Sequence, residues 1–422
     1  MPRVVPDKDV NESLSIDGFG QLAIRRPTDV AELGQVVREA AERGEGLYPV
    51  AGGTALDFGF PPIKPGLALD LRTIAGIVDH PARDLTVTVR AATSMSDLQK
   101  ALAAEGQRLP VDVVERATLG GALATNRSGP RRLGFGTLRD YVIGIRFITD
   151  AGIEVKAGGR VVKNVAGYDL MKLQIGALGT LGIITEVTLK VSPRPEDRAF
   201  VAFGLSSAAV GPTLDRLHAS ASRPVILELL NAAAAKATGI ALPDSDPFVI
   251  VAGFEEKAVT VNWQVSTLKD ELKAAPIRGL MELRGDTCEP LDRALTALQS
   301  RAESRFIAKA SVLPSRLANF ASVAAANHSD LLFHAHAGNG IAFLHLDSPE
   351  LTVERASALI ASLAPAASDA NGRLTVRRCP SEWKKVLPVA GSERGDHALM
   401  RTVKRTLDPQ NLFNPGRLFG NL

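Results

Sequence analysis

The chain has 422 residues, 45% of them hydrophobic and 23% charged, and a net charge of +3. This length exceeds one compact core and predicts two or three domains. The charges are interspersed and form no basic stripe, so we expect no nucleic-acid partner. Two cysteines, Cys288 and Cys379, make no zinc or iron–sulfur pattern and favour a reducing compartment.

The N-terminal residues 1–15 are polar and lack the apolar core of a signal peptide. No run reaches the roughly 18 apolar residues of a membrane span. We therefore expect a cytoplasmic protein without a transmembrane segment, one that is peripheral to a membrane only through its partners.

The first half of the chain alternates helices with short strands. Residues 28–43 place apolar side chains on one helical face, with a capping signal at 28–32 and two glycines after the last turn. The other helices are predicted from capping residues and the spacing of apolar residues, and the strands from the alternation of apolar and polar residues. We predict strands at 47–50, 67–71, 85–91, 142–149, 153–156 and 182–191, a helix at 94–105 and a helical turn at 119–125.

Pro193 and Pro195 mark a boundary, after which strands and helices occur in two similar series. Their order predicts an antiparallel sheet with helices on one face. We expect domains at 1–195, 196–387 and 388–422. The predicted strands are 199–203, 225–230, 248–254, 278–284, 306–311, 331–336 and 341–346, and the helices are 208–220, 257–274, 290–300, 314–327, 353–363 and 396–406.

Three glycine-rich segments, at 49–55, 117–129 and 176–185, lie beside predicted strands. Glycine lets consecutive backbone N–H groups approach an anion closely and form a concave nest. The segments contain neither Gly-x-Gly-x-x-Gly nor the Walker pattern, so the usual Rossmann fingerprint and a P-loop are excluded. The pattern predicts a dinucleotide whose phosphates are held by several loops.

Three further motifs accompany the glycine segments. Residues 164–170 read Asn-Val-Ala-Gly-Tyr-Asp-Leu, residues 129–132 read Gly-Pro-Arg-Arg, and the tail at 408–418 contains Phe-Asn-Pro-Gly-Arg. Together, over 22–191 and 408–418, these features resemble the PCMH-type FAD-binding domain of the vanillyl-alcohol oxidase family. They look most similar to the FAD-binding E subunits of bacterial glycolate oxidases.

The resemblance implies an α+β fold with a two-part PCMH-type FAD-binding domain, an antiparallel-sheet cap domain and a C-terminal tail that returns to the flavin domain. It implies that the first glycine loop binds the pyrophosphate through backbone N–H groups, while Asn414 approaches the isoalloxazine ring. The same residues also fit ordinary turns, helix caps and, for the arginines, an exposed loop. The predicted cofactor-binding residues are Val50, Ala51, Gly52, Gly53, Thr54, Ala55, Leu56, Thr118, Leu119, Gly120, Gly121, Asn126, Ser128, Gly129, Arg131, Arg132, Gly182, Ile183, Ile184 and Asn414.

Covalent attachment of flavin in this family uses a histidine near the first loop or a cysteine near the second. Residues 48–60 contain no histidine and residues 110–140 contain no cysteine. The resemblance therefore implies noncovalent FAD. Tyr168 and Asp169 either orient a loop against the flavin or, as we favour, satisfy hydrogen bonds within their own loop.

Catalytic members of the family carry His-x-Gly-Asp-Gly-Asn-x-His and Glu-His-Gly-Ile-Gly, which hold a metal and the substrate. Here His336 fits the first position, Phe343 stands at the second histidine, and 376–380 read Val-Arg-Arg-Cys-Pro. His334 and His336 share one face of a strand, with His345 nearby. We expect buried, hydrogen-bonded histidines and no metal, and we assign no catalytic residue.

The resemblance implies an FAD subunit of a complex that oxidises glycolate or another 2-hydroxy acid. Its partners would be a related catalytic flavoprotein subunit and an iron–sulfur subunit, since two cysteines cannot hold a cluster that needs four. The alternatives are a noncatalytic flavin-binding scaffold and a free-standing flavin oxidase of a sugar or lactone.

Overall fold

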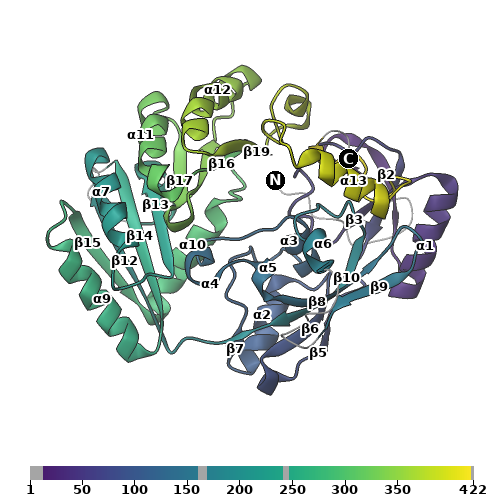
Figure 1. Cartoon of the computed structure of the whole chain (residues 1–422), viewed down its shortest axis with the longest axis horizontal. Coiled ribbons are helices and arrows are strands. Elements are labelled where there is room, and N and C mark those ends of the chain that lie inside the picture. The colour runs from purple at the N-terminus through teal and green to yellow at the C-terminus, as the bar shows by residue number, and fades with distance from the viewer. Residues whose placement is uncertain (1–12, 160–168, 241–246, 420–422) are drawn as a thin grey trace. The chain divides into compact units, whose positions relative to one another are not determined.

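A computed structural model describes residues 13–159, 169–240 and 247–419. Contacts divide the chain into two compact units, labelled by element in Figure 1. Unit 1 comprises 1–127, 137–194 and 392–422, and unit 2 comprises 128–136 and 195–391. The predicted domain limits at 195 and 387 lie near two of these divisions, whereas the excursion at 128–136 was not predicted.

The first sheet of unit 1 has the order β1-β2-β4-β3. Strands β2, β4 and β3 are parallel, and β1 pairs antiparallel with β2. Helix α1 connects the parallel strands β2 and β3, which lie on either side of β4. The bounds are β1 (Ser13–Ile16), β2 (Phe19–Arg25), α1 (Val30–Arg43), β3 (Gly46–Val50) and β4 (Gly66–Asp70).

Helix α1 shows why this crossover forms where it does. The Asp29 side chain caps it by accepting a hydrogen bond from the Glu32 backbone N–H, and Gly44 ends it with φ 64°. Thr28, part of the expected capping signal, instead donates to the Glu32 carboxylate. The apolar face of α1 packs on Leu47 and Leu69 of the sheet.

The second sheet of unit 1 is antiparallel, with the order β5-β6-β10-β8-β9. Short helices and a two-stranded ladder, β7 with β11, connect its strands. The bounds are β5 (Ile77–Asp79), β6 (Thr86–Arg90), α2 (Met95–Ala104), β7 (Gln107–Arg108), α3 (Leu119–Ala124), α5 (Leu138–Tyr141), β8 (Val142–Ile148), β9 (Glu154–Gly158), α6 (Met171–Gln174), β10 (Ile183–Lys190) and β11 (Ser192–Pro193).

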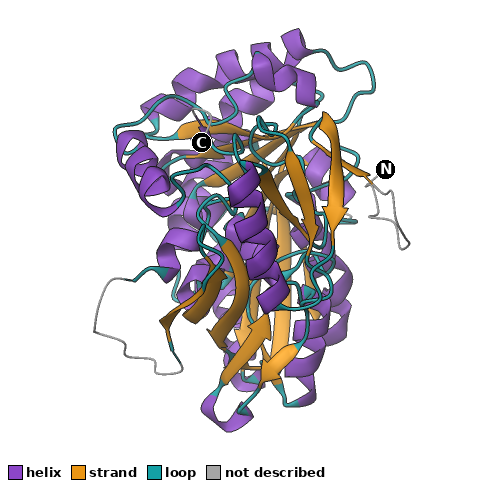
Figure 2. Ribbon diagram, turned by 90° about the vertical axis from the view of Figure 1, so that its right-hand side faces the viewer, coloured by secondary structure: helices purple, strands orange, loops and turns teal. Residues whose placement is uncertain are grey.

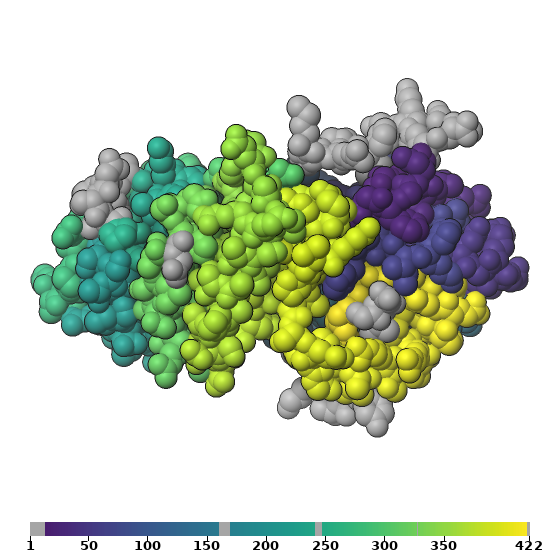
Figure 3. All heavy atoms as spheres, turned by 90° about the horizontal axis from the view of Figure 1, so that it is seen from above, coloured from purple at the N-terminus to yellow at the C-terminus, as the bar shows by residue number. Residues whose placement is uncertain are grey.

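The C-terminal tail belongs to unit 1, where helix α13 (His397–Leu407) leads to a segment beside β3. Leu47 donates its N–H to the Leu412 carbonyl and accepts the N–H of Asn414, and Leu47 and Phe413 form a parallel bridge. Figure 3 shows this yellow C-terminal segment against the purple and blue N-terminal residues of the same unit.

Buried charges hold the tail in place. The Asp408 carboxylate accepts the N–H groups of Leu412 and Phe413, both at 2.9 Å. Lys404 Nζ pairs with Asp408 and also donates to the carbonyls of Thr180 at 2.8 Å and Phe413 at 3.1 Å. Because Lys404 and Asp408 are both buried, each charge depends on the other for its compensation.

Unit 2 contains an eight-stranded antiparallel sheet with the order β15-β12-β14-β13-β17-β18-β16-β19. It consists of two β-α-β-β-α-β halves, joined where β13 pairs with β17. The strands are β12 (Asp197–Leu205), β13 (Ile226–Asn231), β14 (Phe248–Glu256), β15 (Arg278–Arg284), β16 (Phe306–Ser311), β17 (Leu332–His336), β18 (Ile341–Leu346) and β19 (Arg373–Arg378).

Helices cover both faces of the first half of this sheet, which corrects the expectation of helices on one face. Along the whole sheet, four helices pack on one side. On the other side, α8 and α10 pack on the first half. The reason is that β14 is buried on both faces along almost its whole length. Figure 2 shows the helices in purple beside the orange strands. The bounds are α4 (Arg132–Phe135), α7 (Ser207–His218), α8 (Ala232–Ala237), α9 (Ala258–Leu272), α10 (Glu289–Leu298), α11 (Leu317–Asn327) and α12 (Val353–Asp369).

The predicted helices and strands are confirmed to within a few residues, except that α12 extends six residues beyond the expected end at 363. Strands β1, β2, β5, β7, β11 and β19 were not predicted. In the described residues, no helix combines the length and apolar character needed to cross a bilayer.

Replacing Lys404 by Met should destabilise unit 1 by about 3 kcal/mol, because it leaves the buried Asp408 carboxylate uncompensated. Urea unfolding followed by the release of FAD fluorescence measures the loss. Arg405→Met, on the exposed side of the same helix, is the control and should change little. Equal losses in the two variants would contradict the role given to the Lys404–Asp408 pair.

Candidate cofactor site

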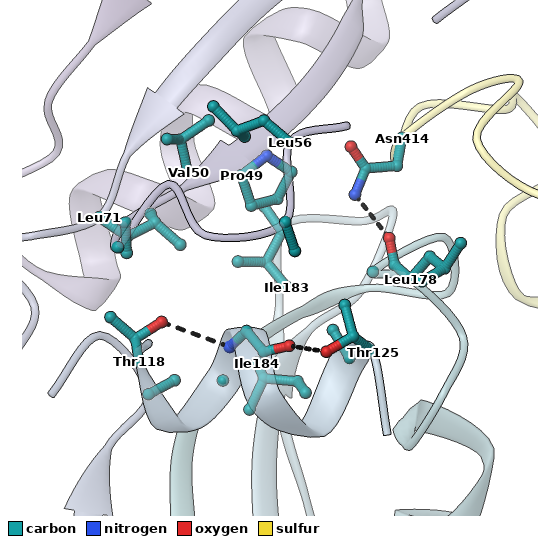
Figure 4. Close-up of a pocket in the computed structure, with 18 of the residues that line it drawn as sticks. Pro49, Val50, Leu56, Leu71, Thr118, Thr125, Leu178, Ile183, Ile184 and Asn414 are labelled. Carbon is teal, nitrogen blue, oxygen red and sulfur yellow. Dashed lines mark hydrogen bonds between the residues drawn. The ribbon is translucent and has the colours of Figure 1, made fainter. Parts of the chain in front are cut away.

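A cavity opens in unit 1. Its lining comes from the loop after β3, the start of α3, the turns before β10 and the C-terminal tail, as Figure 4 shows. The predicted residues that line it are Val50, Ala51, Gly52, Gly53, Thr54, Ala55, Leu56, Thr118, Gly120, Gly121, Gly182, Ile183, Ile184 and Asn414.

The loop after β3 offers main-chain donors to the cavity. The N–H groups of Gly52, Gly53, Thr54 and Ala55 donate to no acceptor among the described residues. Gly53 has φ 65°, a conformation that glycine adopts without strain. Consecutive unpaired N–H groups of this kind form a nest for anionic oxygens, so this loop fits a pyrophosphate.

Close backbone approach explains two other glycines. A Cβ on Gly52 would lie 2.5 Å from the Arg116 carbonyl oxygen, and a Cβ on Gly120 would lie 2.9 Å from the Ala91 Cβ. Both distances are too short for real side chains. The first glycine loop and the segment before α3 therefore pack main chain against main chain, which brings two distant parts of the sequence to one cavity.

Helix α3 begins at the cavity. The Thr118 hydroxyl accepts the Gly121 N–H at 3.4 Å, and the Thr125 hydroxyl donates to the Gly121 carbonyl at 2.7 Å (Figure 4). Leu119, which was predicted to contact the cofactor, is fully buried and does not line the cavity. Asn126, with φ 47°, lies beside Gly176 and is also absent from the lining.

The tail closes the cavity. Asn414 Nδ2 donates to the Leu178 carbonyl at 2.7 Å, which orients the Asn414 amide at the cavity wall (Figure 4). The Asn414 N–H is bonded to Leu47, so both ends of the residue are fixed. Its φ of 44° is one that asparagine tolerates better than most residues.

Arg417 was missed as a functional residue by the sequence analysis. Its guanidinium donates to the carbonyls of Leu56, Phe58 and Phe60 at 2.6–2.8 Å and pairs with Asp17 at 3.3 Å. Burial lowers the pKa of this arginine. Arg417 ends the Asn-Pro-Gly-Arg motif of the tail, and that position was the available signal. It fixes three carbonyls directly after the first glycine loop and itself lines the cavity.

The second glycine-rich segment, at 117–129, is divided between the two units, because unit 2 begins at residue 128. Ser128, Gly129, Arg131 and Arg132 belong to unit 2 and do not line the cavity. The Arg132 guanidinium donates to the Ser128 hydroxyl at 3.1 Å.

Arg131 requires a correction. Its buried guanidinium pairs with Glu255 at 2.5 Å and binds Asp292 through both carboxylate oxygens, at 2.7 and 2.8 Å. A guanidinium held by two carboxylates is not available to a phosphate. We therefore withdraw the phosphate-binding role predicted for Arg131.

Tyr168 and most of the motif at 164–170 lie outside the described residues. Asp169 is described, and its carboxylate lies 3.5 Å from Lys172 Nζ.

The three histidines predicted to be neighbours lie together in unit 2. His334 and His336 share one face of β17, and the rings of His334 and His345 are 5.2 Å apart. His336 Nδ1 lies 2.8 Å from Glu228, and His345 Nδ1 lies 2.9 Å from Ser304 Oγ. Neither ring nitrogen of His334 has a partner among the described residues, which differs from the expected hydrogen-bonded state.

These residues do not fit a metal centre. Among the described residues, no group of three or more His, Cys, Asp or Glu side chains is placed to hold a metal ion. The ring of Phe343, at the second histidine position of the family motif, stacks on His334 with centroids 4.9 Å apart. Burial lowers the pKa of His345 to about 3 and that of His334 well below its ordinary value. Both imidazoles are therefore neutral at pH 7.

Comparison with known proteins identifies two segments. Residues 22–158 match the FAD binding domain, and residues 385–418 match the C-terminal domain of FAD linked oxidases. The chain is 28% identical to the glycolate oxidase subunit GlcD of Bacillus subtilis (strain 168) over 422 residues, which cover 94% of this chain and 88% of that protein.

Sequence identity to the glycolate oxidase subunit GlcE of Escherichia coli (strain K12) is higher but extends over fewer residues. It reaches 45% identity over 133 residues, 31% of this chain and 38% of that protein. A solved structure of alkyldihydroxyacetonephosphate synthase has a TM-score of 0.69 at 19% identity, covering 94% of this chain and 77% of that one. This likeness shows the fold alone.

Two segments of the chain are thus similar to FAD-linked oxidases, and FAD is its cofactor. The resemblance to the E subunit in particular rests on a partial match, since the longer similarity is to GlcD.

Replacing Gly52 by Ala should weaken FAD binding by about tenfold or more. The added Cβ would meet the Arg116 carbonyl and force the two loops that line the cavity apart. Titration of the apoprotein with FAD, followed by flavin fluorescence, measures the affinity. Gly395→Ala, at a unit 1 position where a Cβ meets nothing within 4 Å, is the matched control. Unchanged affinity in Gly52→Ala would argue against close packing of these loops around the ligand.

Unit 2 should lose stability as the pH falls from 6.5 towards 3. The folded state holds the pKa of His345 at about 3 against an ordinary 6.5, so only unfolded His345 takes up a proton in this range. Each pKa unit corresponds to about 1.4 kcal/mol. Both tryptophans, Trp263 and Trp383, lie in unit 2, so their fluorescence during urea unfolding reports on this unit.

His345→Asn should make the free energy of unfolding of unit 2 fall less steeply over that pH range. His218→Asn, at an exposed position of α7, is the control and should keep the wild-type slope. The same slope in His345→Asn and wild type would contradict a buried neutral imidazole at this position.

Proposed function

We propose that the chain is the FAD-binding subunit of a complex that oxidises glycolate or a related 2-hydroxy acid. The observation that carries the proposal is the cavity of unit 1, where unpaired backbone N–H groups, glycine contacts and a fixed Asn414 converge from distant segments. The similarity to two subunits named for glycolate oxidase supports the choice of substrate.

The proposed roles of the residues follow from the geometry. The nest at 52–55 binds the pyrophosphate, and Arg417 keeps that nest open by holding the neighbouring carbonyls. Residues 182–184 pack at the adenine end, and Asn414 orients the ring. Bound FAD supplies hydride acceptance and onward electron transfer. The lining contains neither His nor Cys, which supports noncovalent binding.

We propose that substrate oxidation needs partner subunits: a related catalytic flavoprotein and an iron–sulfur protein, in the cytoplasm. Catalytic relatives place metal-binding residues at two motif positions of unit 2. This chain has Phe343 at the first position and Arg377 and Arg378 at the second. A metal cannot then position the substrate in this chain. The proposed FAD-binding domain is 1–195 with the returning tail 388–422, and 196–387 is the proposed cap domain.

A noncatalytic, flavin-binding scaffold is the second candidate. The same changes in unit 2 favour it, because the cofactor site is complete while the metal-binding residue types are replaced. The two candidates differ in whether the flavin of this chain is reduced during turnover.

Anaerobic glycolate should bleach the flavin absorbance of the assembled complex at least about tenfold faster than that of the purified chain alone. The physical reason is that the chain lacks the metal-binding residues that orient the substrate. Stopped-flow spectroscopy of both preparations measures the rates. The complex carrying Gly52→Ala in this chain is the control that attributes the signal to this flavin.

Three outcomes would change the proposal. A purified chain without flavin absorbance would remove it altogether. Equal bleaching of the isolated chain would show direct catalysis. The complex that carries Gly52→Ala could lose the FAD of this chain and still bleach at the same rate as the wild-type complex. That result would favour the scaffold.

A further inference from the structure

One carbonyl of the first glycine loop is held by a side chain from a distant part of unit 1. Arg127 Nη2 donates to the Thr54 carbonyl at 2.8 Å. Thr54 lines the cavity, whereas Arg127 is half-buried and does not belong to the lining. Arg127 was also not among the residues predicted to bind the cofactor. It therefore reaches the cavity through the main chain of the loop.

This hydrogen bond sets the direction of the peptide between Thr54 and Ala55. A peptide unit is planar and trans, so its C=O and N–H groups point to opposite sides of the chain. Because the Thr54 carbonyl is turned to Arg127, the Ala55 N–H is directed away from that guanidinium. Ala55 lines the cavity, and its N–H donates to no acceptor among the described residues. The bond thus leaves this N–H to a ligand.

The main chain fixes the position from which Arg127 reaches the loop. Helix α3 ends in a Schellman motif, in which the Asn126 N–H donates to the Leu123 carbonyl at 3.0 Å. The Arg127 N–H donates to the Ala122 carbonyl, also at 3.0 Å. Asn126 has the left-handed conformation that the motif requires, with φ 47°. The backbone of Arg127 is therefore held to a helix that itself lines the cavity.

The end of α3 also holds the third glycine-rich segment. The Gly176 N–H donates to the Leu123 carbonyl and the Leu178 N–H to the Ala124 carbonyl, both at 2.9 Å. These bonds satisfy carbonyls that the last turn of a helix leaves without intrahelical partners. Parts of all three glycine-rich segments thus meet at the end of α3, and Arg127 joins the first of them to it.

We propose that Arg127 is a positioning residue for the pyrophosphate of FAD, because it holds the peptide between Thr54 and Ala55 with its N–H towards the ligand. The inference rests on the proposed pyrophosphate site at 52–55 and deepens it. A loop that is fixed in its binding conformation before the ligand arrives loses less conformational freedom on binding. A charged donor suits this role, since its hydrogen bond to a carbonyl is stronger than that of a neutral donor.

Arg127→Met should weaken FAD binding to the full-length apoprotein by about tenfold or more, since the loop loses a charge-assisted hydrogen bond. Arg127→Lys should retain most of the affinity, because one ammonium donor is enough for one carbonyl. Arg83→Met, at an exposed position of unit 1, is the control and should match wild type. Flavin fluorescence during titration measures the affinities, and circular dichroism confirms that each variant is folded.

Two further measurements separate positioning from other roles of Arg127. The ³¹P NMR resonances of bound FAD report on the pyrophosphate itself, and they should shift in Arg127→Met but not in Arg83→Met. Titration at about 0.1 M and about 1 M salt tests whether the arginine acts only by attracting the phosphates, since such an attraction is screened at the higher concentration. The loss of affinity in Arg127→Met should be similar at both.

Several results would overturn the inference: wild-type affinity in Arg127→Met, a loss that disappears at high salt, weaker binding with unshifted ³¹P resonances, or equal losses in Arg127→Met and Arg127→Lys. Its failure is distinguishable from failure of the proposed function, because none of these readouts involves glycolate. If the complex oxidises glycolate and Arg127→Met binds FAD normally, the inference fails alone. Shifted ³¹P resonances in Arg127→Met, with a complex that leaves glycolate unoxidised, would remove only the proposed function.

Discussion

The cofactor site depends on Arg417, a buried cation that binds backbone carbonyls. A loop that turns its N–H groups towards a ligand must direct carbonyls elsewhere, and buried carbonyls need donors. Arg417 satisfies those of Leu56, Phe58 and Phe60 from the far end of the chain. The Lys404–Asp408 pair in turn fixes the tail that carries Arg417. The main chain around the cavity is thus supported by side chains of the C-terminal tail.

Unit 2 shows the opposite principle, in which side chains define the site. Its sheet brings three histidines, Phe343 and the Glu228 carboxylate to one face. Burial keeps the imidazoles of His334 and His345 neutral, and the ring of Phe343 stacks on His334. Changes in a few side chains therefore alter what such a face can bind without altering the sheet.

Sequence reasoning succeeded where glycine and capping residues determine the main chain. The positions at 50–56, 118–121 and 182–184 were predictable as a group because glycine marks close approach, and all but Leu119 line the cavity. The prediction of a phosphate-binding role for Arg131 was wrong, because the position of a long charged side chain depends on partners that are distant in sequence. Here these partners are Glu255 and Asp292. The stacking of Phe343 on His334 needed the strand register, which one sequence cannot give.

The two principles bear on how the activity could divide among subunits. A site built from backbone groups requires few particular side chains, so the flavin cavity can persist while side chains elsewhere diverge. A site built from histidine and carboxylate ligands is lost when one ligand becomes phenylalanine and others become arginine, because a cation cannot be held by cations. A chain with the first site complete and the second one converted can retain FAD without retaining a metal. For that reason the flavin and the chemistry of the substrate need not belong to the same subunit.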